Sequence, residues 1–194
     1  AINKTASEIQ NVKGGVVGGA IKEGILKTVD EIEIRPGQVY EEANKKVWKS
    51  YKTSIKSLMT GNSPVEEVGP GGSVGAMTEL DPSIVKSDSL TGNVVGKVGK
   101  LPPVWQELNL EPHLLKRVVG LEENTKVEPI RIKEPLMLNV NSAATVGIVT
   151  KVRKNLVQVQ LKLPICAEKT DRITISRRIG TRFRLIGYGT IKDE

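Results

Sequence analysis

The residue types that catalyse reactions in proteins are scarce in this chain and are not spaced for chemistry. The 194 residues include one histidine, His113, and one cysteine, Cys166, so a zinc site of Cys and His ligands is excluded. Carboxylate pairs such as Glu41 and Glu42 are sequence neighbours, and adjacent side chains on an extended strand point apart. A serine nucleophile elbow joins a strand to a helix, and no helix is predicted after the one Gly-x-Ser-x-Gly spacing, at residues 71–75. We therefore predict no catalytic residue and no metal site.

Two glycine-rich segments invite comparison with phosphate-binding loops. A P-loop needs the spacing Gly-x-x-x-x-Gly-Lys-[Ser/Thr], whereas the segment from Gly92 to Val98 is one residue short and ends in valine. The segment 69–77, GPGGSVGAM, is not followed by a predicted helix whose N-terminus could face a phosphate. A turn that leads into a strand is the simpler interpretation. We predict no cofactor for this chain.

The elements that carry these residues are predicted to be strands. Residues 13–37 hold two glycine pairs, and the following Glu-Ile alternation at 31–35 ends at a Pro-Gly turn, a pattern typical of β-strands. Paired glycines in a strand mark a bend or the close approach of another backbone or a ligand. The fold class predicted is all-β, with two small antiparallel β-barrels in tandem over residues 1–98 and 99–194. The prolines of 101–103 are the expected linker.

Some local elements can be predicted more closely. Residues 39–57 are expected to form a long hairpin or its loop, and residues 59–72 a loop. A short helix is expected over Pro82–Leu90, capped by Asp81. The segment 113–119 is expected to be extended rather than helical.

The charge is concentrated in the second half of the chain. Residues 1–98 carry 12 Lys and Arg against 12 Asp and Glu, whereas residues 99–194 carry 17 against 10. A basic domain is suited to a polyanionic partner such as nucleic acid, although a solvated basic face would give the same count. The polar residues 1–10 and the absence of a long apolar run predict no signal peptide and no membrane span. A lone cysteine fits a reducing compartment, so a cytoplasmic location is expected.

Five segments resemble one protein family, the gamma subunit of translation initiation factor 2. The doubled glycines of 13–19 distinguish this family from elongation factor Tu, which shares the hairpin. The short sequences LPPVW, LDPS and RLIGYGTI resemble those of the archaeal members. The resemblance covers residues 8 to 192, and the GTP-binding domain that opens the family's sequence is missing from this chain. The matching segments are 13–19, 70–90, 90–120, 134–152 and 163–191.

The resemblance implies a role in recognition rather than catalysis. Members of the family deliver initiator methionyl-tRNA to the small ribosomal subunit, and GTP with magnesium belongs to the intact protein. In translational GTPases the first barrel forms a pocket for the aminoacylated 3′ end of the tRNA. Carried over to this sequence, the pocket residues are Gly14, Gly15, Val16, Val74, Gly75 and Ala76.

Further partners are implied in the same way. The first barrel docks the alpha subunit in this family, and the candidate residues are Arg35, Tyr40 and Trp48. The second barrel would pack on the missing GTP-binding domain, through which the beta subunit is attached. It would also present basic residues to RNA phosphates. These residues are Arg177, Arg178, Arg182 and Arg184.

Two turns depart from the family pattern. A glycine is usual before the Asp30–Glu31 strand, where this chain has Val29, and a β-branched residue resists positive φ. That turn is therefore expected to differ. Asn141 replaces a second glycine and can keep its turn, because asparagine tolerates the left-handed region.

Two other classes of protein remain open from the sequence. An elongation-type factor, such as elongation factor Tu or the selenocysteine-specific factor, would bind elongator tRNA without an alpha subunit. A structural scaffold made of two barrels would bind no RNA.

Overall fold

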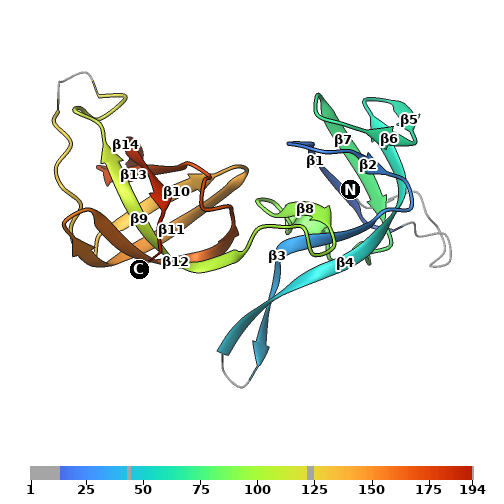
Figure 1. Cartoon of the computed structure of the whole chain (residues 1–194), viewed down its shortest axis with the longest axis horizontal. Helices are drawn as coiled ribbons and strands as arrows, with labels where there is room; N and C mark the ends of the chain where they lie inside the picture. The colour runs from blue at the N-terminus through green and yellow to red at the C-terminus, as the bar shows by residue number, and fades with distance from the viewer. Residues whose placement is uncertain (1–13, 43–44, 122–124, 194) are drawn as a thin grey trace. The chain divides into compact units, whose positions relative to one another are not determined.

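The computed structural model describes residues 14–42, 45–121 and 125–193, and residues 1–13 of the predicted first domain lie outside this description. Strands form most of the described chain (Figure 1). It divides into two compact units, and the division falls between Leu101 and Pro102.

The first unit is built on one antiparallel sheet. Its strand order is β1-β7-β4-β3-β8, with β5 paired to β4, and a separate two-stranded ribbon joins β2 to β6. The strands are β1 (Val16–Ala20), β2 (Leu26–Lys27), β3 (Glu31–Glu42), β4 (Lys45–Thr60), β5 (Ser63–Val65), β6 (Glu67–Val68), β7 (Ser73–Thr78) and β8 (Val94–Lys97).

The strand pairing of the first unit has two ends. Within the described residues, β1 pairs only with β7 and β8 pairs only with β3, so the hydrogen bonds of this sheet do not close a ring. Its interior is divided between two apolar clusters, one around Ile55 and Leu58 and the other around Ile34 and Val85. A closed first barrel, which the sequence predicted, therefore stays a prediction.

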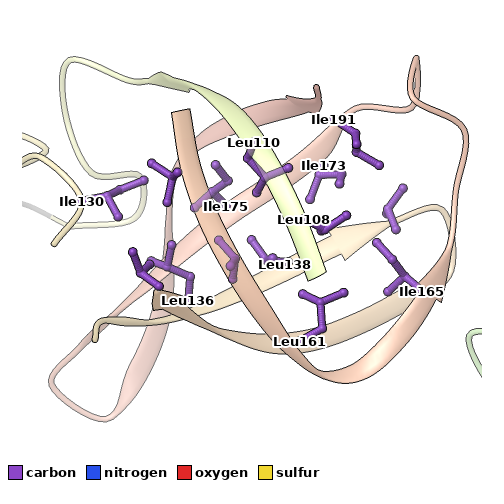
Figure 2. Packing of buried hydrophobic residues seen from close by; sticks show 14 of the residues in the cluster. Leu108, Leu110, Ile130, Leu136, Leu138, Leu161, Ile165, Ile173, Ile175 and Ile191 are labelled. Atoms are coloured by element: carbon purple, nitrogen blue, oxygen red, sulfur yellow. The ribbon is translucent and has the colours of Figure 1, made fainter. Parts of the chain in front are cut away.

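The second unit is a closed barrel with the strand order β10-β11-β12-β9-β14-β13. Alternate residues of every strand point inward and form one continuous apolar core, part of which is drawn in Figure 2. The barrel therefore has no free sheet edge. Its strands are β9 (Val104–Leu114), β10 (Pro135–Val140), β11 (Ala143–Arg153), β12 (Leu156–Cys166), β13 (Ile173–Ile179) and β14 (Arg182–Ile191).

The predicted helix over Pro82–Leu90 is wrong. The segment forms turns with a three-residue 3-10 helix at Lys86–Asp88. Ser87 (φ 56°) and Asp88 (φ 54°) both adopt left-handed backbone, which ends a right-handed helix. Asp81 still caps the first turn, because its carboxylate accepts the Ser83 N–H at 2.7 Å.

Of the three other local predictions, one is confirmed, one is wrong and one is correct in part. The hairpin over residues 39–57 is confirmed as the β3–β4 pair. The segment 59–72, predicted to be a loop, contains the short strands β5 and β6. The extended segment predicted for 113–119 is correct only in part, because β9 ends at Leu114.

The turns at Val29 and Asn141 both use left-handed backbone, although the two side chains differ in how well they tolerate it. Val29 adopts φ 65° with a side chain that is 83 % exposed, so the expectation that this turn must differ is wrong. The Val29 N–H donates to the Ile55 C=O at 2.9 Å, which fixes the turn despite the β-branched side chain. Asn141 adopts φ 50° as predicted.

Candidate functional site

The first glycine pair is explained by close packing of the chain on itself. A Cβ atom on Gly14 would lie 1.7 Å from the Thr78 carbonyl oxygen, and one on Gly15 would lie 2.8 Å from the Val85 side chain. The Gly15 carbonyl accepts two hydrogen bonds from Thr78, one from the N–H at 2.9 Å and one from Oγ1 at 2.8 Å. These two glycines therefore hold β1 against the rest of the unit.

The predicted residues on the neighbouring strand divide between two faces. Val74 and Ala76 are buried in the core of the first unit. Gly75 lies between them and points the other way, and a Cβ on it would meet nothing within 4 Å. Only Gly75 of these three is placed to meet a ligand.

A bare backbone surface lies on that outer face. Gly18 is directly opposite Gly75, and Val16 is opposite Met77, while Met59 of β4 is the next neighbour of Gly75. Met59 is 44 % exposed. Glycine leaves room for a flat group to reach the backbone, and methionine side chains adapt to such a group. We name this surface the glycine platform, and it consists of Val16, Gly18, Met59, Gly75 and Met77.

A separate cavity lies beside the free edge of β1. Its volume is about 120 Å³, and only Val16 of the predicted pocket residues contributes to it. Asp88 is the single charged residue in its wall. We name it the edge cavity; its lining is Val16, Val17, Gly18, Ile34, Val85, Asp88, Leu90, Thr91, Asn93 and Val95.

The three candidate docking residues do not form one surface. Tyr40 pairs with Val47 and Trp48 pairs with Val39, so Tyr40 and Trp48 lie on opposite faces of the hairpin. Tyr40 is 41 % exposed, and the Lys49 ammonium lies 5.6 Å from its ring centre. One face of the hairpin therefore carries Trp48, and the other carries Tyr40, whose hydroxyl lies 3.4 Å from that of Tyr51.

Arg35 is engaged inside the first unit. Its guanidinium donates to both carboxylate oxygens of Glu33, at 2.9 and 3.1 Å, and to the Leu101 carbonyl at 3.2 Å. Glu33 also accepts the Gly99 N–H at 3.3 Å. Arg35 lowers the pKa of the Glu33 carboxyl from 4.5 to about 2, against the opposing effect of burial. This pair fastens the last residues of the first unit rather than presenting a docking group.

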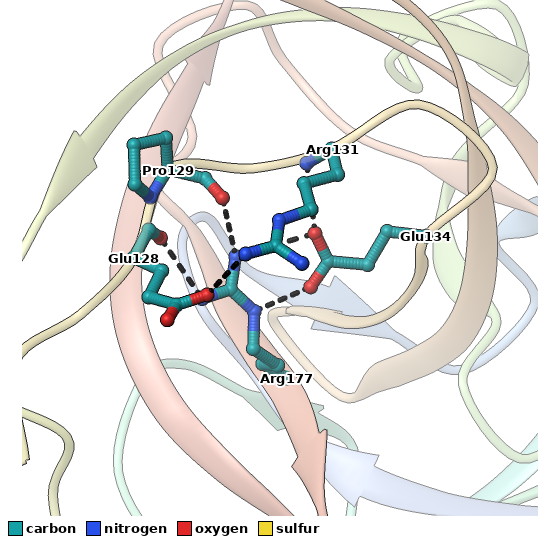
Figure 3. Close-up of polar contacts among 5 residues, drawn as sticks. All are labelled: Glu128, Pro129, Arg131, Glu134 and Arg177. Atoms are coloured by element: carbon teal, nitrogen blue, oxygen red, sulfur yellow. Dashed lines mark hydrogen bonds and ion pairs between the residues drawn. The ribbon is translucent and has the colours of Figure 1, made fainter.

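Arg177 has a similar internal role in the second unit (Figure 3). It forms an ion pair with Glu134 and donates to the carbonyls of Glu128 and Pro129 at 2.9 and 3.0 Å. Arg131 pairs with Glu128 at 2.6 Å in the same segment. The guanidinium thus fastens residues 128–134 to β13, and few of its N–H groups remain for a phosphate.

Of the other three arginines, Arg178 and Arg182 are exposed and Arg184 is half-buried. Arg182 is opposite Ile179 and Arg184 is opposite Arg177, so Arg182 and Arg184 share one face of the hairpin. Arg178 is exposed and donates to the Gly180 carbonyl at 3.3 Å. No ion pair to Arg182 or Arg184 is present within the described residues.

Neither of the two glycine-rich segments compared with phosphate-binding loops leads into a helix. Val94–Lys97, in the segment compared with a P-loop, is the strand β8 and pairs with β3. The glycines of 69–72 lead directly into strand β7, so no helix N-terminus follows them. Among the described residues, no cluster of three or more His, Cys, Asp or Glu is placed to hold a metal ion.

The sequence interpretation missed three members of the glycine platform, namely Gly18, Met59 and Met77. The second glycine pair was visible in the sequence, but its partner across the sheet depends on the register of β1 with β7. The two methionines carry no motif and are placed by strands distant in sequence.

The fold places this chain among all-β proteins made of two compact units, the second of which is a closed barrel. It is similar to the crystal structure of the bacterial selenocysteine-specific elongation factor EF-Sec, with a TM-score of 0.65 over 92 % of this chain and 25 % of that one. The sequences are 15 % identical, so this likeness shows the fold alone.

Sequence comparison identifies the family. Residues 106–191 match the family described as "Initiation factor eIF2 gamma, C terminal". The chain is 52 % identical over 191 residues to translation initiation factor 2 subunit gamma of Methanocaldococcus jannaschii, which covers 98 % of this chain and 46 % of the relative. It is 54 % identical over 192 residues to the same subunit of Pyrococcus abyssi, covering 99 % and 47 %.

The predicted resemblance to the archaeal members of the initiation factor 2 gamma family is confirmed. The chain spans about half the length of these relatives. In the part of the chain that is described, no helix has the length and apolar character to cross a bilayer.

Proposed function

We propose that this chain supplies the tRNA- and subunit-binding domains of an initiation factor 2 gamma, which delivers initiator methionyl-tRNA to the small ribosomal subunit. Residues 1–98 and 99–194 are its second and third domains, each a β-barrel, and the cytoplasm is its location. The observation that carries the proposal is the 52 % identity to a gamma subunit over 98 % of the chain. GTP and magnesium are bound by a domain outside this chain, which also attaches the beta subunit.

The glycine platform is the proposed contact for the aminoacylated 3′ end of the tRNA. Gly18 and Gly75 expose backbone on which a nucleotide can lie, and Val16 with the two methionines gives apolar contacts to a base. Gly14 and Gly15 support the platform by packing β1 against Thr78. Val74 and Ala76 support it from the core side.

A substitution on the platform tests the tRNA contact. Gly75→Val has space for its side chain and a favourable β-propensity, so it should fold normally and weaken binding of methionyl-tRNA at low salt at least tenfold. Gly19→Val is the matched control, because Gly19 also has nothing within 4 Å of a Cβ and its side-chain position alternates with that of Gly18. Equal affinity of both variants in a filter-binding titration would remove the platform from the proposal.

The β3–β4 hairpin is the proposed docking site of the alpha subunit. Val39 and Trp48 form a cross-strand apolar pair on one face, and Tyr40 lies on the other. Arg35 contributes to docking only indirectly, because its guanidinium is bound to Glu33 inside the first unit. Calorimetric titration of this chain with the alpha subunit should show a 1:1 complex with Kd of about 1 µM or tighter. Trp48→Ala should weaken it about tenfold or more, whereas a folded chain that gives no heat would contradict the proposal.

The basic hairpin of the second unit is the proposed RNA contact. Arg182 and Arg184 share a face and Arg178 is exposed, so these three are suited to phosphates. In a titration with a ribosomal RNA hairpin, the double variant Arg182→Ala, Arg184→Ala should reduce the salt dependence of log Kd by about two units. Arg177→Met should lower stability and leave that slope unchanged. An unchanged slope in the double variant would exclude this RNA contact.

A further inference from the structure

The edge of β1 that faces away from β7 carries backbone groups that form no strand pairing with the other described residues. The Thr78 N–H donates to the Gly15 carbonyl at 2.9 Å, which fixes the alternation of bonds along the β1–β7 pair. Val16 and Gly18 therefore direct their N–H and C=O groups away from β7. Within the described residues, no second strand pairs with β1. An unpaired edge of this kind is a template for another extended chain.

The edge cavity opens beside these same residues. Its volume is about 120 Å³, and its lining combines polar and apolar residues. Its apolar walls include Ile34 of β3, Leu90 of the intervening turn and Val95 of β8. The space is suited to one aliphatic side chain.

The wall of the cavity is fixed by hydrogen bonds, and its charge is negative. The Asn93 side chain accepts the Gly37 N–H at 2.7 Å and donates to the Leu90 carbonyl at 3.1 Å. The Thr91 N–H donates to the Asp88 carbonyl at 2.9 Å, and the exposed Asp88 is one of the lining residues. A basic residue of a ligand would complement this carboxylate.

We propose that the edge of β1 binds an extended segment of a partner protein by strand addition. The segment pairs its backbone with Val16 and Gly18, places a Leu, Ile, Val or Met side chain in the edge cavity, and sets a Lys or Arg beside Asp88. Strand addition obtains affinity from main-chain hydrogen bonds and specificity from pockets for alternate side chains. The proposed tRNA contact uses the outer face of β1 and β7 and shares Val16 and Gly18 with this site, so the two proposals are tested with different ligands.

A capped peptide tests the proposal on the whole chain. The probe is about seven residues long, the length of a short strand, and alternates Thr and Val around a central Leu-Lys pair. We expect it to shift the amide NMR signals of Val16, Gly18 and Val95, with Kd of about 0.1–1 mM. A peptide with Leu-Ser at the centre should bind several-fold more weakly, and one with Asp-Ser should not bind.

Two variants separate the parts of the site. Gly18→Pro lacks the N–H that faces the ligand and should abolish the shifts, while Asp88→Asn should remove the preference for Leu-Lys over Leu-Ser and keep the chain folded. The proposal is overturned if about 1 mM of the Leu-Lys peptide shifts none of these amides in folded protein. It is also overturned if adenosine at the same concentration shifts them and the peptide does not, because the cavity would then belong to a nucleoside.

Discussion

The two units of this chain use the same kind of strand and enclose their interiors to different degrees. In the second unit, 18 buried residues form one cluster inside a closed ring of strands. In the first unit, the described residues form buried clusters of five and three, and the sheet has two ends. The edge cavity and the glycine platform both lie in the unit with the open sheet. Space for ligands is thus found where the core is incomplete.

The largest expected effect comes from the same core truncation made in each unit. Ile175 and Ile34 are both fully buried, but Ile34 also lines the edge cavity. Ile175→Ala should cost about 4 kcal/mol of the free energy of unfolding, because the closed barrel cannot collapse around the void. Ile34→Ala should cost about 2–3 kcal/mol, because its new space joins one that already exists.

One tryptophan in each unit allows the two costs to be read separately. Trp48 reports on the first unit and Trp105 on the second, so urea unfolding followed by fluorescence in Trp48→Phe and Trp105→Phe backgrounds resolves them. Equal losses, or a larger loss for Ile34→Ala, would contradict the difference in enclosure proposed for the two cores.

A smaller effect is expected from the buried ion pair of the first unit. The Glu33 pKa is lowered to about 2 by Arg35, so the stability it contributes is complete above the unfolded pKa of about 4.5 and is lost as pH falls towards 2. We expect a loss of about 2–3 kcal/mol across this range in the unfolding of the first unit. Urea titrations followed by Trp48 fluorescence at pH 6, 4 and 2.5 measure it.

Glu33→Gln is the matched control for this pH dependence. The variant keeps the shape of the side chain and removes the titration, so it should be less stable at pH 6 and should lose less stability on acidification. If both proteins show the same pH profile, the acid sensitivity of the first unit arises elsewhere.

The smallest effect compares the two left-handed turns. Val29→Gly removes a β-branched side chain from φ 65° and loses almost no packing, because that side chain is 83 % exposed. It should stabilise the first unit by about 1 kcal/mol. Asn141→Gly should change the second unit by less than about 0.5 kcal/mol, because asparagine already tolerates this backbone. Thermal melts of the two variants test this, and a destabilised Val29→Gly would show that the valine is not strained.

Local sequence patterns predicted some elements of both units and failed for others. The all-β class and the β3–β4 hairpin were readable because turn residues and period-two alternation are local signals. The helix over Pro82–Leu90 was mispredicted, because local propensity gave no sign of left-handed backbone at Ser87 and Asp88. Arg177 illustrates the same limit: its sequence neighbours suggested RNA, while its ion-pair partner Glu134 lies 43 residues away.

By itself, the sequence determined the family, the strand-rich class and the uneven charge, since these depend on residue identity and local pattern. Only the tertiary structure decided which glycines pack and which are bare, because a Cβ at Gly14 meets Thr78 whereas one at Gly75 meets nothing. It also decided that Gly18 faces Gly75 beside Met59, through the register of three strands. Register and burial are set by contacts between residues far apart in the chain, and no local pattern encodes them.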